Sequence, residues 1–298
     1  MNCPYKFSMA TLKEFNHKIK SLKNTAKITK TMKMVSVSKL RKAQIAQVQA
    51  KAYARQIAGV MSRISAAVDE NSHFLLKRRK AVKNVHIIVI TSDKGLAGAF
   101  NINANKKVIE WLRQHRHKHQ YIHLSFIGKK GWQFFHKILP VRAHYQNATA
   151  DPDYLKAEDI GRDVIKYFLN GQDDEVYITY NQFFSPLSQK TVFEKILPIR
   201  SEEIYKEAGT TFRPDYIFEP AQEFLLNYLV EQYLFFKIYF ALLENSAGEH
   251  GARMTAMENA AKNADELTGR YTLLRNRARQ AAITTELTEI VAGAEALN

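Results

Sequence analysis

The chain has 298 residues, of which 46% are hydrophobic and 11% aromatic, so it can bury a core and is not a wholly disordered protein. Its formal net charge of +15 favours an acidic partner, which could be nucleic acid, a membrane surface or an acidic protein. The single cysteine, Cys3, excludes an intrachain disulfide framework and fits a reducing compartment. No uncharged apolar run reaches the roughly 18 residues that a membrane span needs, and the segment before Met9 lacks a signal-like apolar stretch, so we expect a soluble protein that is not exported.

The N-terminal segment predicts one very long helix. No proline occurs between Pro4 and Pro140, and the first glycine is Gly59. A helix of about 55 residues would be roughly 80 Å long, more than the width of a compact domain of this size, so it must project from its domain. Steps of three and four residues give a stripe with a small, polar middle: Leu12, Phe15, Ile19, Leu22, Ala26, Thr29, Lys33, Ser36, Leu40, Ala43, Gln47, Ala50, Ala54, Ile57, Met61, Ile64 and Val68.

The C-terminal segment predicts a second long helix. After Pro220 no proline recurs, and apolar residues are dense from Phe224 to Leu243. Gly248 and Gly251 interrupt the pattern, and from them we expect either a local irregularity or close contact with the partner helix. Beyond them a stripe continues through Met257, Ala260, Ala264, Leu267, Tyr271, Leu274, Ala278, Ala281, Thr285, Thr288 and Ala292.

The charges of these two segments are opposite in character. From Lys13 to Arg55 Glu14 is the sole acid, whereas acids outnumber bases from Gln222 to Asn298. The pattern favours two helices that pair with each other, and two separately solvated faces are the alternative.

The middle of the chain, about Lys83 to Arg213, predicts a small α/β domain. Continuous β-branched runs at Val85–Thr91, Tyr121–Ile127 and Val176–Tyr180 predict strands, and Thr191–Leu197 is a weaker fourth. Helical patterns at Asn105–His115 and Ala157–Leu169 alternate with them. Strand–helix alternation indicates a Rossmann-like α/β domain with a largely parallel sheet.

Two segments could carry chemistry. The turn Ser92–Asn101 follows the best strand and could cradle a phosphate at a helix N-terminus, but its glycine spacing fits neither nucleotide-binding fingerprint, and a tight strand-to-helix turn is the better interpretation. The histidines His115, His117, His119 and His123 could share a helical face, but neighbouring cations disfavour zinc, and a solvated basic helix end is the better interpretation.

No nucleophile motif, paired acid or metal signature is readable elsewhere in the sequence. Two further functions remain open at this stage: a coiled-coil nucleic-acid binder, suggested by the charge, and a nucleotide-binding enzyme, suggested by the glycine turn. The apolar stripe along the basic helix argues for a protein partner instead of DNA.

Several sequence blocks, taken together, are specific. Near the N-terminus are Ile19–Thr25, Lys27–Val35 and Ser38–Gln44, and Ile90–Asn101 follows. The C-terminal segment has Glu249–His250, Ala252–Met257, Asn263–Ala264 and Asn276–Val291. In this order they resemble the gamma subunit of bacterial F-type ATP synthases. The stretch from about Lys106 to Tyr216 adds little to the resemblance.

The resemblance implies a central rotor shaft: an antiparallel coiled coil of terminal helices (residues 9–80 and 216–298) with an α/β domain (residues 81–215). It implies that the shaft couples ion-driven c-ring rotation to sequential conformational change of the catalytic beta subunits. Its expected partners are the alpha and beta subunits, epsilon, the c-ring and delta, at the cytoplasmic face of the bacterial inner membrane. No active site, cofactor, metal, nucleic acid or small-molecule ligand of its own is implied.

The resemblance also implies residues at which shaft and stator are coupled. Met32 and Lys33 match the position that faces an acidic segment of beta. The others are Arg253, Arg279, Gln280, Thr284 and Glu286. The sequence departs from the family's pattern at Ala97, where cysteine is common, and at Gly248 and Gly251, where serine and alanine are usual.

Overall fold

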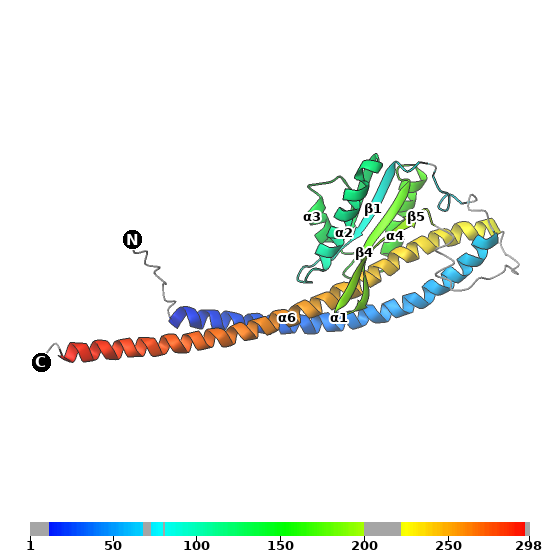
Figure 1. Cartoon of the computed structure of the whole chain (residues 1–298). Coiled ribbons are helices and arrows are strands. Elements are labelled where there is room, and N and C mark those ends of the chain that lie inside the picture. Colours follow the sequence, from blue (N-terminus) through cyan, green and yellow to red (C-terminus); the bar gives the residue numbers. More distant parts are fainter. Residues whose placement is uncertain (1–11, 68–72, 80, 200–221, 296–298) are drawn as a thin grey trace. The chain divides into compact units, whose positions relative to one another are not determined.

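A computed structural model of the chain describes residues 12–67, 73–79, 81–199 and 222–295. It divides into two compact units, residues 1–35 with 256–298 and residues 36–255. Two long helices contribute to both units: α1 (Leu12–Ala67) and α6 (Gln222–Glu295) (Figure 1). Two long terminal helices are therefore confirmed, although residues 73–79, which belong to the expected N-terminal segment 9–80, are not helical. Residues 9–11, 68–72, 80, 216–221 and 296–298 of the expected segments lie outside the described residues.

The larger unit contains a five-stranded sheet with strand order β3-β2-β1-β4-β5. Figure 1 labels strands β1, β4 and β5 of this sheet. Strand β1 pairs in parallel with β2 and β4, β2 pairs in parallel with β3, and β4 pairs antiparallel with β5. The predicted mixed α/β fold with a largely parallel sheet is thus confirmed. The strands are β1 (Asn84–Ile90), β2 (Tyr121–Ile127), β3 (Val141–Tyr145), β4 (Glu175–Ser185) and β5 (Ser188–Leu197).

The shorter helices connect the parallel strands. Their bounds are α2 (Phe100–His115), the 3-10 turn η2 (Arg116–Lys118), α3 (Lys129–Phe135) and α4 (Tyr154–Leu169). Helices α2 and α4 begin five and three residues earlier than their apolar patterns predicted, and α3 and β3 were not predicted.

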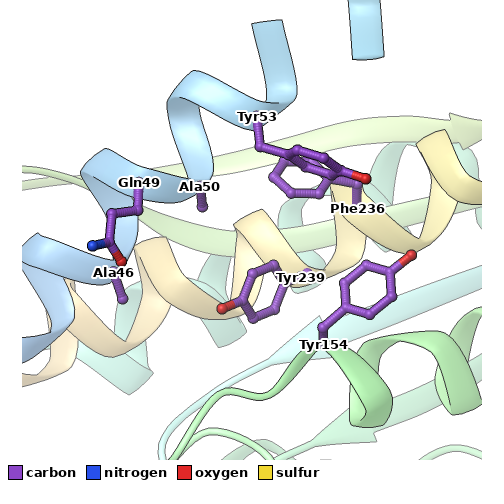
Figure 2. A pocket seen from close by; sticks show the side chains of 7 residues that line it. All are labelled: Ala46, Gln49, Ala50, Tyr53, Tyr154, Phe236 and Tyr239. Atoms are coloured by element: carbon purple, nitrogen blue, oxygen red, sulfur yellow. The ribbon is translucent and has the colours of Figure 1, made fainter. Parts of the chain in front are cut away.

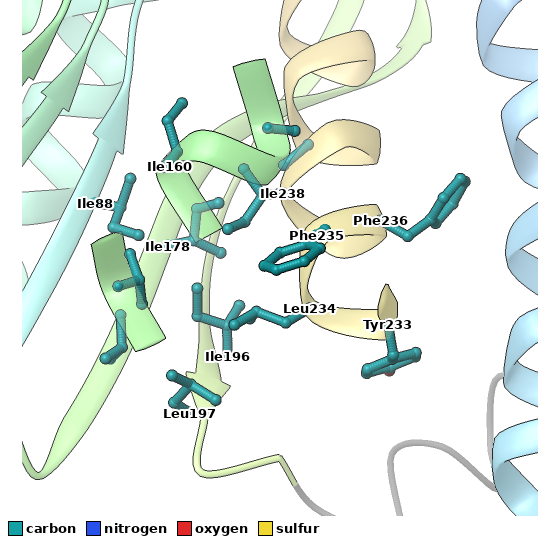
Figure 3. Packing of buried hydrophobic residues seen from close by; sticks show 14 of the residues in the cluster. Ile88, Ile160, Ile178, Ile196, Leu197, Tyr233, Leu234, Phe235, Phe236 and Ile238 are labelled. Carbon is teal, nitrogen blue, oxygen red and sulfur yellow. The ribbon is translucent and has the colours of Figure 1, made fainter. Parts of the chain in front are cut away.

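Alternate residues of β1 enter two different hydrophobic cores, as the period of a strand buried on both faces requires. Val85, Ile87 and Val89 pack with Val108 of α2 and Phe135 of α3. On the other face, Ile88 and Ile90 join a larger core with α4 and α6. Figure 3 shows this core, where Ile88, Ile160, Ile178, Phe235 and Ile238 pack together.

Helices α4 and α6 approach each other closely in this core. A Cβ atom built on Gly161 of α4 would lie 2.2 Å from Cδ1 of Phe235 of α6, so only glycine fits at this position. Helix α1 meets the same core through Ala50 and Ile57. Where the three helices meet, a small cavity of about 310 Å³ is lined by Ala46, Gln49, Ala50, Tyr53, Tyr154, Phe236 and Tyr239 (Figure 2).

Helix α6 runs without a break through Gly248 and Gly251. The expected local irregularity is therefore wrong, and the contact with the partner helix stays a prediction. The nearest atoms to a Cβ at either glycine belong to α2 and to the β4–β5 hairpin with its turn. The sequence pattern could not identify this contact because it is made with the sheet and not along the helix stripe.

Candidate functional site

In the smaller unit, α1 and α6 pair antiparallel. Phe15 lies against Tyr271 with ring centroids 6.4 Å apart, and Lys18 lies over the same tyrosine ring. Further along α1, Lys30 Nζ is 2.9 Å from Asp265 Oδ2. Residue numbers on α1 rise as those on α6 fall, so the two helices run in opposite directions. The predicted antiparallel pairing and the opposite charge of the two segments are both confirmed within this unit.

The contact between these helix segments is made by a mixture of large and small side chains. Ile19, Ala26 and Thr29 of α1 are buried, as are Met257, Ala261 and Ala264 of α6. The Thr29 hydroxyl donates hydrogen bonds to the carbonyl oxygens of Thr25 and Ala26 in its own helix. Alanine and threonine bury little apolar area per residue, so this seam holds the helices together less strongly than a leucine seam would.

Met32 and Lys33 are half-buried on α1. Lys33 Nζ lies 3.1 Å from Glu258 Oε1, and this pair is more than one-third exposed on both sides. The hydrogen bond and charge of Lys33 hold the pKa of Glu258 below its usual range. The ammonium group is thus held loosely by an acid of the same chain, and exposed pairs of this kind add little to stability. Sequence reasoning had not paired Lys33 with Glu258.

The predicted residues near the C-terminus lie on an exposed stretch of α6. Arg279, Gln280, Thr284 and Glu286 are all exposed, and the Thr284 hydroxyl donates to the Gln280 carbonyl one turn earlier. Four apolar side chains on this stretch share a helical spacing and are also exposed: Ile283, Leu287, Ile290 and Val291. An exposed apolar stripe along a helix marks a surface for a protein partner.

Arg253 lies in a different environment, buried in the larger unit. Its guanidinium donates to the carbonyl oxygens of Lys94 and Gly95, both at 3.2 Å, and to Glu249 Oε1 at 2.6 Å. The structure therefore groups Arg279, Gln280, Thr284 and Glu286 with Met32 and Lys33 in one unit and places Arg253 in the other. Nothing in the sequence pattern signals that Arg253 binds backbone carbonyls in the turn after β1.

Burial changes the titration of two neighbours of Arg253. It lowers the pKa of His250 to about 4, with further lowering by Arg253 and Lys39. It raises the pKa of Glu249, although the charge and hydrogen bond of Arg253 oppose that shift. His250 is therefore neutral at physiological pH, where its Nδ1 can accept from Arg253 over 3.4 Å.

Comparisons with known proteins bear on this arrangement. The family model described as ATP synthase matches residues 11–297. The ATP synthase gamma chain of Geobacter metallireducens is 41% identical over 289 residues, covering 97% of this chain and 99% of the relative. That of Trichlorobacter lovleyi is 42% identical with the same coverage. The chain belongs to the ATP synthase gamma-chain family.

Solved structures of ATP synthases contain chains with a fold similar to that of this chain. The central stalk and c-ring structure of the Tetrahymena thermophila mitochondrial ATP synthase contains a chain 28% identical to this gamma-family chain, with a TM-score of 0.60, covering 78% of this chain and 99% of that one. A chain of the Euglena gracilis mitochondrial ATP synthase in rotational state 3 covers 96% of this chain and 94% of its own length, with a TM-score of 0.64. At 19% identity the second likeness concerns the fold alone.

In this gamma-family chain, the Ser92–Asn101 turn is a strand-to-helix turn stabilised from within. Asn101 Oδ1 accepts from the Ser92 backbone N–H at 2.9 Å, and Leu96 and Gly98 have φ angles of 64° and 57°. The carbonyls of Lys94 and Gly95 accept from Arg253. The turn thus contacts α6. At Gly98, glycine provides the backbone freedom that a left-handed φ requires.

The histidine-rich segment is organised around Trp111 of α2. The rings of His115 and His119 stack on this indole at centroid distances of 4.6 and 5.8 Å. His123 instead accepts from Arg142 through Nδ1 at 2.9 Å. Among residues 12–67, 73–79, 81–199 and 222–295, no group of three or more histidine, cysteine or acidic side chains is placed to hold a metal ion.

One buried cluster was not predicted, because its members lie far apart in the sequence. His86 Nε2 is 2.7 Å from Ser125 Oγ, and His86 Nδ1 is 3.2 Å from Asp173 Oδ2, the order of groups in a serine hydrolase triad. All three side chains are at most 1% exposed, so no substrate can reach Ser125. Arg142 also pairs with Asp173, and the cluster is therefore a buried polar network that joins β1, β2 and β3 to the segment before β4.

Proposed function

We propose that this gamma-family chain, as the central shaft of an F-type ATP synthase, couples rotation to the catalytic subunits through the lightly held α1–α6 pair and the exposed end of α6. The observation that supports this most directly is the antiparallel pair itself. Its seam includes alanine and threonine side chains, its ion pairs at Lys30 and Lys33 are partly exposed, and the last part of α6 carries an exposed apolar stripe.

The proposed coupling residues are Met32 and Lys33 on α1, and Arg279, Gln280, Thr284 and Glu286 on α6. Their exposed or half-exposed side chains suit contacts that form and break as a shaft turns. Because exposed ion pairs contribute only about 0–1 kcal/mol each, such contacts can guide rotation without locking it. Each shaft angle then favours a different nucleotide affinity in each catalytic site, which is a population shift driven by mechanical work.

The proposed partners are the alpha and beta subunits around the helix pair, and epsilon, the c-ring and delta within the same complex. The chain would be a peripheral subunit at the cytoplasmic face of a bacterial inner membrane. No helix within the described part of the chain has both the length and the apolar character needed to cross a bilayer. In this proposal ATP chemistry belongs to the beta subunits, and ion translocation belongs to the membrane sector.

The proposal is tested by assembly. The chain, carrying an affinity tag, is co-expressed with alpha and beta subunits of a bacterial relative, and the purified complex is assayed for ATP hydrolysis. We expect recovery of a stoichiometric complex whose hydrolysis depends on the chain. Recovery of nucleic acid without alpha and beta subunits, or tight ATP binding by the chain alone, would instead support one of the two alternative functions.

A further inference from the structure

The crevice where a doubly wound sheet usually holds its ligand is covered in this chain by its own helix α6. Such ligands bind outside the carboxyl ends of the strands, at the point where the strand order reverses. Here the order reverses between β1 and β4. Strands β2 and β3 lie on one side of β1, and strands β4 and β5 lie on its other side. Helix α6 contacts the turn that follows β1 and the carboxyl-terminal part of β4, as set out below.

The first anchor of α6 is Glu244, which is 3% exposed. Its Oε2 accepts from the backbone N–H of Phe183 at 2.7 Å, and its Oε1 accepts from Nε2 of Gln47 on α1 at 2.5 Å. The next residue, Asn245, accepts from the backbone N–H of Asn181 over 3.4 Å. One carboxylate thus joins β4, α1 and α6, in a buried site where unmatched polar groups are costly.

The second anchor is Arg253, which connects α6 to the turn after β1 through the carbonyls of Lys94 and Gly95. Its buried neighbour Glu249 accepts from the same guanidinium, which balances the charge. Glu244 and Arg253 are nine residues apart, about 14 Å along a helix. Two directional anchors at this separation resist both sliding and rocking of α6 on the sheet.

Two glycines bring the helix backbone close to the sheet between the anchors. A Cβ atom on Gly248 would lie 3.0 Å from Cε2 of Phe100 and 3.3 Å from the Asn181 carbonyl oxygen. A Cβ atom on Gly251 would lie 3.1 Å from Phe183 Cε2 and 3.1 Å from Pro186 Cα. Each glycine destabilises a helix by about 1 kcal/mol relative to alanine. Glycine at these two positions is therefore explained by the close approach of α6 to the sheet and to Phe100, which a larger side chain would prevent.

We infer that Glu244, Gly248, Gly251 and Arg253 form a rigid joint through which torque passes from the α/β body into α6. This joint is defined by those four residues and rests on the proposed function of the chain as a shaft. Hydrophobic contact alone is non-directional and permits slip, whereas hydrogen bonds to backbone groups of β4 and of the turn after β1 fix one register. These four are positioning residues, since they act by holding α6 and not by touching the catalytic subunits.

The first experiment compares glycine substitutions in the complete, membrane-embedded ATP synthase containing this chain. Gly248→Ala with Gly251→Ala moves α6 away from the sheet, whereas Gly269→Ala is a matched control because nothing lies within 4 Å of its added Cβ. We expect the double variant to retain ATP hydrolysis within about twofold and to lose at least fivefold in ATP-driven ion pumping, while Gly269→Ala keeps the wild-type ratio. An unchanged pumping-to-hydrolysis ratio in a correctly assembled double variant would overturn the inference.

A second experiment covers the case in which the double alanine variant does not fold. Arg253→Lys keeps the positive charge beside Glu249 but replaces the guanidinium that reaches the Lys94 and Gly95 carbonyls with a single ammonium group. If torque passes through these bonds, the assembled Arg253→Lys complex should retain ATP hydrolysis and lose ATP-driven ion pumping. A wild-type ratio of pumping to hydrolysis in this variant would contradict the inference.

These results are separable from failure of the proposed function itself. If the chain is not a shaft, the wild-type chain will not confer hydrolysis or pumping on alpha and beta subunits. If it is a shaft but the joint carries no torque, the wild-type complex will pump and the joint variants will behave like it.

Discussion

Lys33 of α1 and Glu258 of α6 form an ion pair of 3.1 Å in which both side chains remain more than one-third exposed. The lysine that the sequence resemblance assigns to an acidic segment of another subunit therefore already has an acidic partner in its own chain. In the proposed mechanism the two acids compete for the same ammonium group. That competition lets the external contact form without a large net change in free energy.

Loss of this pair should affect coupling more than folding. We expect Lys33→Met and Glu258→Gln each to shift the melting temperature of the purified chain only slightly, because exposed pairs contribute little. Lys33→Met should lower ATP synthesis per transported ion in the complex, whereas Glu258→Gln, which frees the ammonium, should not. Circular dichroism melts and coupled synthesis assays measure the two effects, and equal loss of coupling in both variants would argue against an external role for Lys33.

Truncation after Gln280 should separate the two parts of the chain. It removes the exposed stripe of Ile283, Leu287, Ile290 and Val291 but no residue of the compact unit 36–255. We expect the melting transition of the α/β body to be retained and the torque or coupling of the assembled enzyme to fall. Loss of the whole fold on truncation would contradict the division into two units.

His250 should make the chain less stable in mild acid. Its pKa is near 4 in the folded chain and near 6.5 when unfolded, so the unfolded state takes up the proton first as the pH falls. The contribution of His250 to stability is complete above about pH 6.5, falls by about 2–3 kcal/mol on acidification to about pH 4, and is level below that.

Urea unfolding of wild type and His250→Gln at pH 7 and pH 4.5 isolates this contribution. Glu249, whose raised pKa acts in the opposite direction, is present in both proteins and cancels in the difference. The variant should therefore lose less stability between the two pH values than the wild type. Parallel losses would show that His250 is not titrating in the buried environment described.

Asp173 should be essential to the α/β body. It is fully buried, and although burial alone would raise the pKa of its carboxyl group, His86 and Arg142 outweigh burial and hold that pKa below its usual range. Asp173→Asn leaves Arg142 without its buried acid, a change that typically costs about 3–5 kcal/mol. The exposed Asp151→Asn is the matched control. Chemical denaturation measures both, and a cost below about 1 kcal/mol for Asp173→Asn would contradict the buried network.

The elements that the sequence predicted well are those whose pattern repeats over many residues. The bounds of β2 at Tyr121–Ile127 agree with the apolar run, and both long helices follow their stripes. The seven residues of α3 and the five half-buried residues of β3 are too few to establish a period, and both were missed. Helix starts were placed late, since Phe100 and Tyr154 precede the first clear apolar repeat.

The site was harder to predict, because its contacts join residues that are distant in the sequence. Helical spacing indicated that α1 and α6 pair, but not that Lys33 meets Glu258. The resemblance singled out Arg253 but not the Lys94 and Gly95 carbonyls that it binds, because every residue has a backbone carbonyl and the sequence does not mark those that accept. The glycines at 248 and 251 were noticed as anomalies, yet their neighbours are on the sheet.

Rotation of the chain itself is the most direct test of its role as a shaft. Cys3 is replaced by serine, a cysteine is introduced at the exposed Leu187, and a bead is attached there to a surface-immobilised complex of alpha, beta and this chain. The account predicts ATP-driven rotation of the bead in one direction. ATP hydrolysis at the normal rate with a stationary or randomly moving bead would contradict it.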